Sequence, residues 1–176
     1  MTTQFSPLSL TTKTEDQIEV TITYLEQTAR PLLPTPIAPR RKTALMRAEH
    51  PPLHFYRYLY DLVGAPYNWI SRRRLNDQEL ASIIHRDDVY VYVLYVDGAP
   101  AGIAEIDAQD AKTFELKFFG LAPDFVGDGL GRFFLTNVIE LAWSLGPEKL
   151  RLETCTLDHP AALPLYQKFG FQVVDR

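Results

Sequence analysis

The chain has 176 residues, of which 46% are hydrophobic and 23% are charged, and its formal net charge is −4. This composition is typical of a globular protein that is large enough to bury its own hydrophobic core within one domain. The negative charge argues against a nucleic-acid-binding surface, which requires a basic face. A mildly negative net charge is compatible with a cationic substrate, although it is more often simply a property of a soluble protein's surface.

Cysteine and histidine usage excludes several kinds of site. Cys155 is the only cysteine, so neither an internal disulfide nor a cysteine metal cluster can form. The four histidines are scattered without metal-ligand spacing, so no metal is expected. The first ten residues lack the pattern of a signal peptide, and no apolar run approaches the ~20 residues that a membrane helix needs. We therefore expect a cytoplasmic protein without a membrane partner.

Residues 1–52 predict one strand followed by a proline-rich arm. In "QIEVTITYL", apolar residues at the even positions from Ile18 to Tyr24 alternate with polar ones, which is typical of a half-buried strand. Six of the 13 prolines fall within residues 31–52, which excludes a regular helix or a central strand there. We expect an extended arm that lies on the domain.

Residues 53–86 predict two helices. "LHFYRYLYDLVG" places apolar side chains on one helical face, and Gly64 can cap its end. "NDQELASII" begins with a capping box, in which Asn76 and Glu79 satisfy each other's backbone N–H groups.

Residues 88–176 predict the remaining sheet. "VYVYVLYV" is followed by the hairpin dipeptide Asp97-Gly98, then by "AGIAEID" and "TFELKFFGLA" as two further strands. A long helix, "LGRFFLTNVIELAWSLGP", ends at Gly146. The strand "KLRLETCT" follows, then a short helix with a break near Pro164, and finally the strand "FQVV". This order predicts an α/β fold, with a mixed, mostly antiparallel sheet of about six to seven strands and helices on both faces.

Three glycines alternate in "FVGDGLGRFFL", at the start of the long helix. A helix N-terminus presents free N–H groups, and glycines allow a phosphate to approach them, so Gly127, Gly129 and Gly131 predict an anion site. A dinucleotide motif would need a third glycine where Arg132 stands, and a P-loop would need Lys-Ser or Lys-Thr after Gly131. Both nucleotide alternatives fail.

The chain resembles the GNAT acyltransferase superfamily. The superfamily's loop pattern, Gln/Arg-x-x-Gly-x-Gly/Ala, falls on residues 126–131, and its later Asn, Ala, Tyr and Gly-Phe pattern falls on His159, Ala162, Tyr166, Gly170 and Phe171. The resemblance covers about residues 88–176. The segments "RYLYDLVG", "NWISRRRL", "AGIAEI", "FELKFFGLAP" and "TLDHPAALPLYQKFGF" resemble an uncharacterised bacterial group within it.

The resemblance implies that acetyl-CoA is the co-substrate of a single domain. Its core would be residues 88–176, while residues 53–86 would line the acceptor side. Backbone N–H groups of residues 127–132 would hold the pyrophosphate, and the pantetheine arm would pair with the strand that ends near Leu121. The cofactor-binding residues so implied are Leu121, Val126, Gly127, Gly129, Leu130, Gly131, Arg132 and His159. Two residues depart from the pattern: Val126 replaces Gln/Arg, and Asp128 adds a negative charge beside a polyanion.

Two residues are candidates for catalysis. Glu115 lies 14 positions before Gly129, where some superfamily members carry a general base. Glu105 or water alone are alternatives, and Glu115 is otherwise a strand residue that pairs with Lys117. Tyr166 matches the superfamily tyrosine that donates to the departing thiolate, and its phenol is a suitable hydrogen-bond donor.

The predicted function is transfer of an acetyl group from acetyl-CoA to a primary amine, by direct attack. Trp69, Arg72 and Glu105 are the predicted acceptor-binding residues. The acceptor would be a small amine, a protein N-terminus or a lysine, and a homodimer is compatible with this prediction. The alternative is a non-catalytic acyl-CoA-binding or sensor domain.

Overall fold

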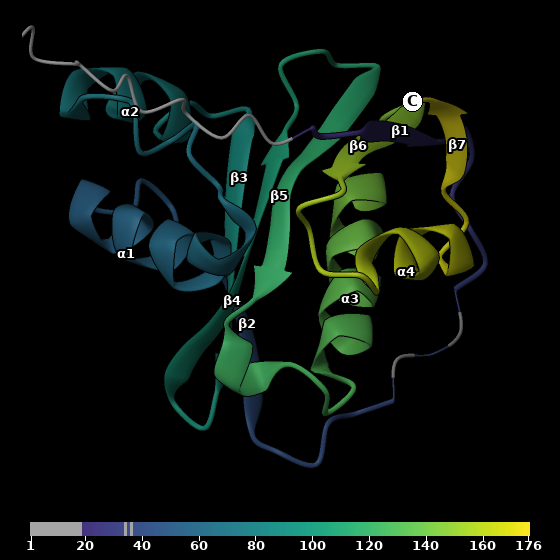
Figure 1. Cartoon of the computed structure of the whole chain (residues 1–176), viewed down its shortest axis with the longest axis horizontal. Helices are drawn as coiled ribbons and strands as arrows, with labels where there is room; N and C mark the ends of the chain where they lie inside the picture. The colour runs from purple at the N-terminus through teal and green to yellow at the C-terminus, as the bar shows by residue number, and fades with distance from the viewer. Residues whose placement is uncertain (1–18, 34, 36) are drawn as a thin grey trace, which may run out of the picture.

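The structure is a computed structural model that describes residues 19–33, 35 and 37–176. A seven-stranded sheet has the order β2-β3-β4-β5-β6-β1-β7, and helices cover both of its faces (Figure 1). The strands are β1 (Ile22–Gln27), β2 (Thr43–Arg47), β3 (Val89–Val96), β4 (Ala99–Asp107), β5 (Thr113–Leu121), β6 (Lys149–Cys155) and β7 (Gln172–Asp175). The α-helices are α1 (Leu53–Gly64), α2 (Asp77–Ile84), α3 (Leu130–Ser144) and α4 (Ala162–Lys168), and short 3-10 helices are η1 (Ala65–Tyr67) and η2 (Pro123–Phe125). The predicted fold class is thereby confirmed.

The central strands follow the predicted connections. β3, β4 and β5 pair antiparallel, and the β3–β4 turn has positive φ at both Asp97 and Gly98, as a tight two-residue hairpin requires. α3 then crosses over, so that β6 pairs with β5 in parallel. The capping box of α2 is present, because Asn76 accepts from the N–H of Glu79 while Glu79 accepts from the N–H of Asn76.

The first described strand has the opposite phase from the one predicted. Thr23, Leu25 and Gln27 are buried, whereas Ile22 is 40% exposed. The polar side chain of Gln27 is tolerated inside because it donates to the carbonyl of Phe169 and accepts from the Trp143 indole. β1 lies between β6 and β7, and residues 17–18 of the predicted strand lie outside the described residues.

The proline-rich arm contains a strand that the sequence pattern did not predict. In Figure 1 the arm runs from β1 around the lower end of the molecule to the opposite edge of the sheet. There, residues 43–47 form β2, which pairs antiparallel with β3 as an edge strand. Five proline-free residues suffice for this pairing, because an edge strand needs a partner on one side only. Arg41 ties the arm down through a 2.8 Å contact with Asp97.

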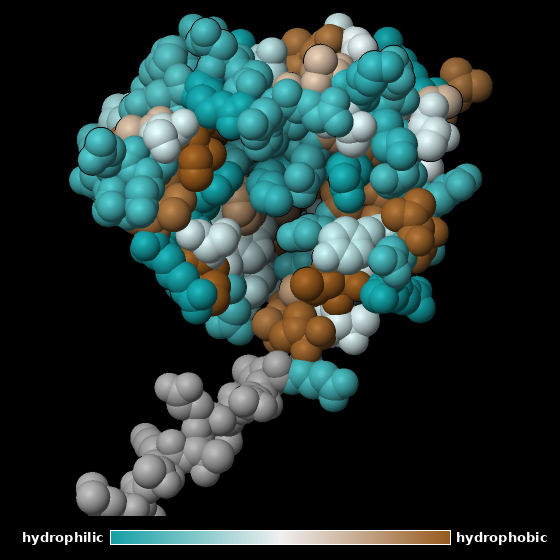
Figure 2. All heavy atoms as spheres, turned by 90° about the horizontal axis from the view of Figure 1, so that it is seen from above, coloured by the Kyte–Doolittle hydropathy of each residue, from teal (hydrophilic) through white to brown (hydrophobic). Residues whose placement is uncertain are grey.

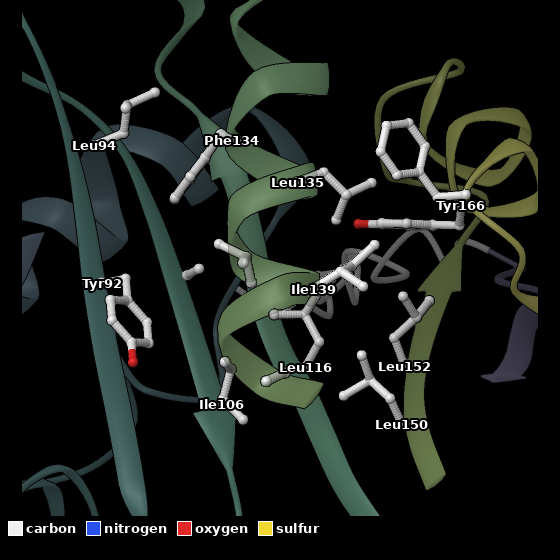
Figure 3. Close-up of a cluster of buried hydrophobic side chains, with 14 of the residues drawn as sticks. Tyr92, Leu94, Ile106, Leu116, Phe134, Leu135, Ile139, Leu150, Leu152 and Tyr166 are labelled. Carbon is white, nitrogen blue, oxygen red and sulfur yellow. The ribbon is translucent and has the colours of Figure 1, made fainter. Parts of the chain in front are cut away.

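Two hydrophobic clusters hold the layers together. One joins α3 and α4 to β4, β5 and β6, and Figure 3 shows Leu135 and Ile139 of α3 facing Leu150 and Leu152 of β6. The other joins α1 and α2 to β3 and β4. Each fully buried Val, Leu, Ile or Phe side chain contributes about 1.5–3 kcal/mol to the free energy of folding.

Two local predictions need correction. Gly64 does not cap α1 in a left-handed conformation; it is the last helical residue, and a Cβ there would lie 2.5 Å from Trp69. Glycine is therefore needed so that the indole can pack on the helix. Pro164 does not break α4. The helix begins at Ala162, so Pro164 lies in its first turn, where proline is tolerated.

Candidate active site

The strands β5 and β6 separate and leave a cleft between them. They pair only over residues 113–116 and 149–152, and β5 carries a bulge at Lys117, which has no partner in β4. A bulge bends its strand away from its neighbour. The resulting cleft has a volume of about 600 Å³ and is lined by the end of β5, the glycine loop, the β6–α4 connection and the α1–α2 connection. Figure 2, which looks down on the molecule, shows a hollow where hydrophobic side chains are exposed among mostly hydrophilic ones.

The glycine loop forms one end of the cleft. Gly127 and Gly129 have φ values of +112° and +75°, which favour glycine, and no protein atom lies within 4 Å of a Cβ built at either position. Within the described part of the chain, the backbone N–H groups of residues 127–132 donate to no protein acceptor. A row of free N–H groups at the start of a 15-residue helix is suited to hold an anion.

The residues of the loop divide between two hollows. Val126, Gly127 and Gly131 line the cleft, whereas Asp128, Gly129, Leu130 and Arg132 line a second hollow of about 690 Å³ between the arm and α3, which we call the arm hollow. Thus a ligand bound at the loop can extend in both directions.

The arm hollow combines apolar walls with positive charge. Leu33 and Ile37 of the arm line it together with Phe133 of α3. Arg40, Arg132 and Lys168 also line it, and none of these cations belongs to an ion pair between described residues.

Tyr166 of α4 lines the cleft. Its ring is buried edge-on between Phe119 and Phe171, and its hydroxyl points toward α3 in Figure 3. Among described residues this hydroxyl has no hydrogen-bond partner. Burial, and secondarily the charge of Asp158, raises the pKa of the Tyr166 phenol. The group therefore keeps its proton and can donate a hydrogen bond to a ligand.

Glu115 lies near the cleft but does not line it. Its carboxylate accepts from the ammonium of Lys117 at 2.9 Å, and its side chain is 28% exposed. Its neighbour on β4 is Asp107, not Glu105, which pairs with Phe118. Glu105 and Glu115 are therefore not cross-strand neighbours that could share a proton.

Glu105 belongs to a buried polar cluster with Arg72 and Tyr56. Its carboxylate is fully buried and accepts from the Arg72 guanidinium at 2.5 Å and from the Tyr56 hydroxyl. Burial, together with the charge of Glu105, raises the pKa of the Tyr56 phenol. Arg72 and Glu105 do not line the cleft, so their predicted acceptor contacts stay a prediction.

Trp69 lines the cleft together with residues that sequence reasoning missed. These are chiefly Tyr60, Phe118, Glu153 and Asp158. Tyr60 and Phe118 have the pattern of ordinary core residues, and their rings pack against each other and against Trp69 at the cleft.

The β6–α4 connection is fixed by Asp158 and places His159 at the cleft. Asp158 accepts from the Thr154 hydroxyl and the Cys155 N–H, while the His159 ring lies edge-on to Tyr67 with centroids 6.3 Å apart. His159 Nδ1 accepts from the N–H of Ala161, which leaves Nε2–H as the donor of the neutral ring.

Among the described residues, no cluster of metal-ligating side chains is present, and no helix is long and apolar enough to cross a membrane.

Comparisons with solved structures show proteins of the same fold. A GNAT family acetyltransferase from Elizabethkingia anophelis with acetyl-CoA bound is 20% identical, with a TM-score of 0.55 over 76% of this chain and 78% of that chain. An aminoglycoside acetyltransferase from an uncultured soil metagenomic sample is 16% identical, with a TM-score of 0.60 over 76% of this chain and 93% of that one.

A functionally unknown conserved protein from Staphylococcus epidermidis is 19% identical, with a TM-score of 0.54 over 88% of this chain. The present chain spans only 59% of that protein's length. No curated protein matches the chain. The sequence model of the "Acetyltransferase (GNAT) family" matches residues 53–171. The chain therefore belongs to the GNAT acetyltransferase family.

Proposed function

We propose that the protein transfers the acetyl group of acetyl-CoA to a primary amine by direct attack. One observation carries the proposal: Gly127 and Gly131 of the glycine loop line the same cleft as Tyr166, whose hydroxyl has no hydrogen-bond partner among the described residues. An anion site and a hydrogen-bond donor that line one cleft match the pyrophosphate and the thioester of acetyl-CoA.

The cleft and the arm hollow suit the parts of acetyl-CoA in order. The pyrophosphate binds the N–H groups of residues 127–132. The pantetheine arm lies along residues 118–121 of β5, whose backbone has no partner from β6 beyond Leu116. The nucleotide end enters the arm hollow, where Arg40, Arg132 and Lys168 offset its phosphate charge.

The reaction begins with deprotonation of the acceptor. An amine with a pKa of ~10.4 is an ammonium ion at pH 7, and freeing it costs about 4.6 kcal/mol. Glu115 takes this proton through water, because its carboxylate is partly exposed two residues before the cleft-lining Lys117.

The free amine then attacks the thioester carbonyl. A C–N bond forms, the C–S bond breaks, and the electron pair leaves on the sulfur of CoA. The attacking nitrogen releases its surplus proton to water, which leaves a neutral amide. Tyr166 donates a hydrogen bond to this thiolate. Since the thiol is the stronger acid and burial raises the pKa of Tyr166, the phenol stabilises the charge without giving up its proton.

Glu105 and Arg72 act as positioning residues in this scheme. Their ion pair joins the α1–α2 connection, which carries Trp69, to the middle of the sheet. The acceptor wall is thereby fixed relative to β5.

A non-catalytic acyl-CoA-binding domain is the second candidate. It is favoured by the pairing of Glu115 with Lys117, which occupies the proposed base, and by Asp128, whose charge lies beside the anion site. Such a domain would bind acetyl-CoA without turnover.

A panel of primary amines, incubated with acetyl-CoA while thiol release is followed, tests the proposal. Amine-dependent release that is slower in Tyr166→Phe supports it. Stabilisation by acetyl-CoA without transfer to any amine favours the binding domain, and absence of acetyl-CoA binding overturns both.

A further inference from the structure

The apolar side chains at the start of β1 line the cleft instead of the core. Val20 and Ile22 are 39% and 40% exposed, and both belong to its lining. Ile70, across the cleft on the α1–α2 connection, is 43% exposed. Hydrophobic side chains on two segments far apart in sequence therefore face one opening.

An aromatic wall adjoins these aliphatic residues. Trp69 packs against Tyr60 and Phe118 with ring centroids 5.5 Å and 5.1 Å apart, and all three line the cleft. Tyr67 and Ile70 of the α1–α2 connection also belong to the cleft lining. Such a surface gains free energy by covering the apolar part of a ligand.

The charges in the cleft suit one or two cations and not a polycation. Lys117 is paired with Glu115. The cleft lining contains two carboxylates, Glu153 and Asp158, and neither belongs to an ion pair between described residues. Asp158 accepts from Thr154 and Cys155 through one oxygen only, so it keeps its charge. A polycation would leave most of its ammonium groups without a partner.

We propose that the acetyl acceptor is a small primary amine that carries one or two positive charges and a large apolar group. This inference rests on the proposed function and names its substrate class. The apolar group lies against Trp69, Ile70 and Ile22, and the cleft of about 600 Å³ leaves room for a small molecule beside the pantetheine arm.

The test compares kcat/KM for three acceptors: hexylamine, ethylamine and sisomicin. The two linear amines have matched basicity, so their ratio reports the apolar contact alone. We expect hexylamine to exceed ethylamine by at least about tenfold, the range that added methylenes reach in an apolar pocket. Sisomicin, a polycation, should be the poorest acceptor.

Variants locate the apolar contact. Trp69→Ala and Ile22→Thr should each lower the hexylamine-to-ethylamine ratio by about three- to tenfold. Ile22→Thr keeps a β-branched residue at an exposed strand position, so it remains informative if Trp69→Ala fails to fold. Tyr58→Ala is the matched control, because Tyr58 is an exposed aromatic residue outside the cleft lining.

Equal kcat/KM values for the two linear amines, or a preference for sisomicin, would overturn this inference while leaving the acetyltransferase function intact. An unchanged ratio in both Trp69→Ala and Ile22→Thr would also overturn it. Transfer to no amine at all, despite acetyl-CoA binding, would instead overturn the proposed function.

Discussion

The guanidinium of Arg72 lies 2.5 Å from the carboxylate of Glu105, and this buried ion pair links the α1–α2 connection to the inner strand β4. The Tyr56 hydroxyl donates to the other carboxylate oxygen, and the Arg72 guanidinium also lies over the Phe118 ring at 5.2 Å. Glu105 is fully buried, so its charge depends on these partners.

Removing Arg72 should therefore destabilise the protein strongly. Arg72→Met leaves the Glu105 carboxylate without its counter-charge and should lower the free energy of unfolding by about 3–5 kcal/mol. Arg73→Met removes an exposed partner of Asp61 and should cost less than about 1 kcal/mol. Urea unfolding at pH 7 measures both. Equal losses in the two variants would contradict the coupling of Glu105 to Arg72.

Stability should fall at alkaline pH because of two buried tyrosines. The pKa values of Tyr56 and Tyr166 are raised in the folded protein, chiefly by burial. Above pH ~10 the unfolded chain loses these protons first, so stability that is complete below that pH declines as pH rises. Each tyrosine contributes a slope of about 1.4 kcal/mol per pH unit. Tyr166→Phe should remove one such contribution from urea unfolding between pH 9 and 11, and an unchanged slope would contradict the burial of its hydroxyl.

Local sequence patterns predicted the elements whose partners are near in the chain. β3 and α1 have the predicted bounds, because alternation and helical spacing set them locally. The Asp97-Gly98 hairpin and the α2 capping box followed from side-chain chemistry alone. The position of the glycine loop at the start of α3 was equally local.

Features that depend on distant partners were missed. The phase of β1 depends on Trp143 and on the carbonyl of Phe169, both more than 100 residues away, which make Gln27 a buried residue. β2 exists because β3 offers a free edge. Glu153 and Asp158 line the same cleft as Trp69 only because β5 separates from β6. Alternation along β1 showed an apolar stripe but not which side of the sheet it faces.

Acetyl-CoA binding should depend on Gly129. Acetyl-CoA should raise the melting temperature of the wild-type protein, because a ligand that binds only the folded state stabilises by about 2.7 kcal/mol at 100 times its Kd. Gly129→Asp puts a side chain and a negative charge at the anion site and should abolish this shift. Gly98→Asp is the matched control, since Gly98 also has positive φ and open space but lies in the β3–β4 turn. An equal acetyl-CoA shift in both variants would contradict the loop assignment.

The nucleotide end of CoA should be recognised in the arm hollow. Removing the 3′-phosphate, as in dephospho-CoA, should weaken binding by about three- to tenfold, as expected for partly exposed charge contacts. Arg40→Ala should weaken CoA binding but not dephospho-CoA binding, because Arg40 has no described ion-pair partner and lines the hollow. Arg74→Ala, on the exposed α1–α2 connection, should leave both unchanged. Calorimetry that shows equal losses for both ligands in Arg40→Ala would place the phosphate elsewhere.

Catalysis should separate the roles of Glu115 and Tyr166. With an accepted amine, Glu115→Gln should lower kcat by about 10²- to 10⁴-fold at pH 7, the usual contribution of a general base. The loss should shrink as pH rises toward the pKa of the amine, because solvent then deprotonates the acceptor.

Tyr166→Phe should lower kcat at every pH below the alkaline range while the Kd of acetyl-CoA changes little, since its hydrogen bond forms mainly to the departing sulfur. Lys117→Met is the informative companion to Glu115→Gln, because it frees the Glu115 carboxylate from its ion pair without removing it. A pH–rate profile that is the same in wild type and Glu115→Gln would show that Glu115 is not the base, which would then have to be sought in water or in Glu153 and Asp158 of the cleft lining.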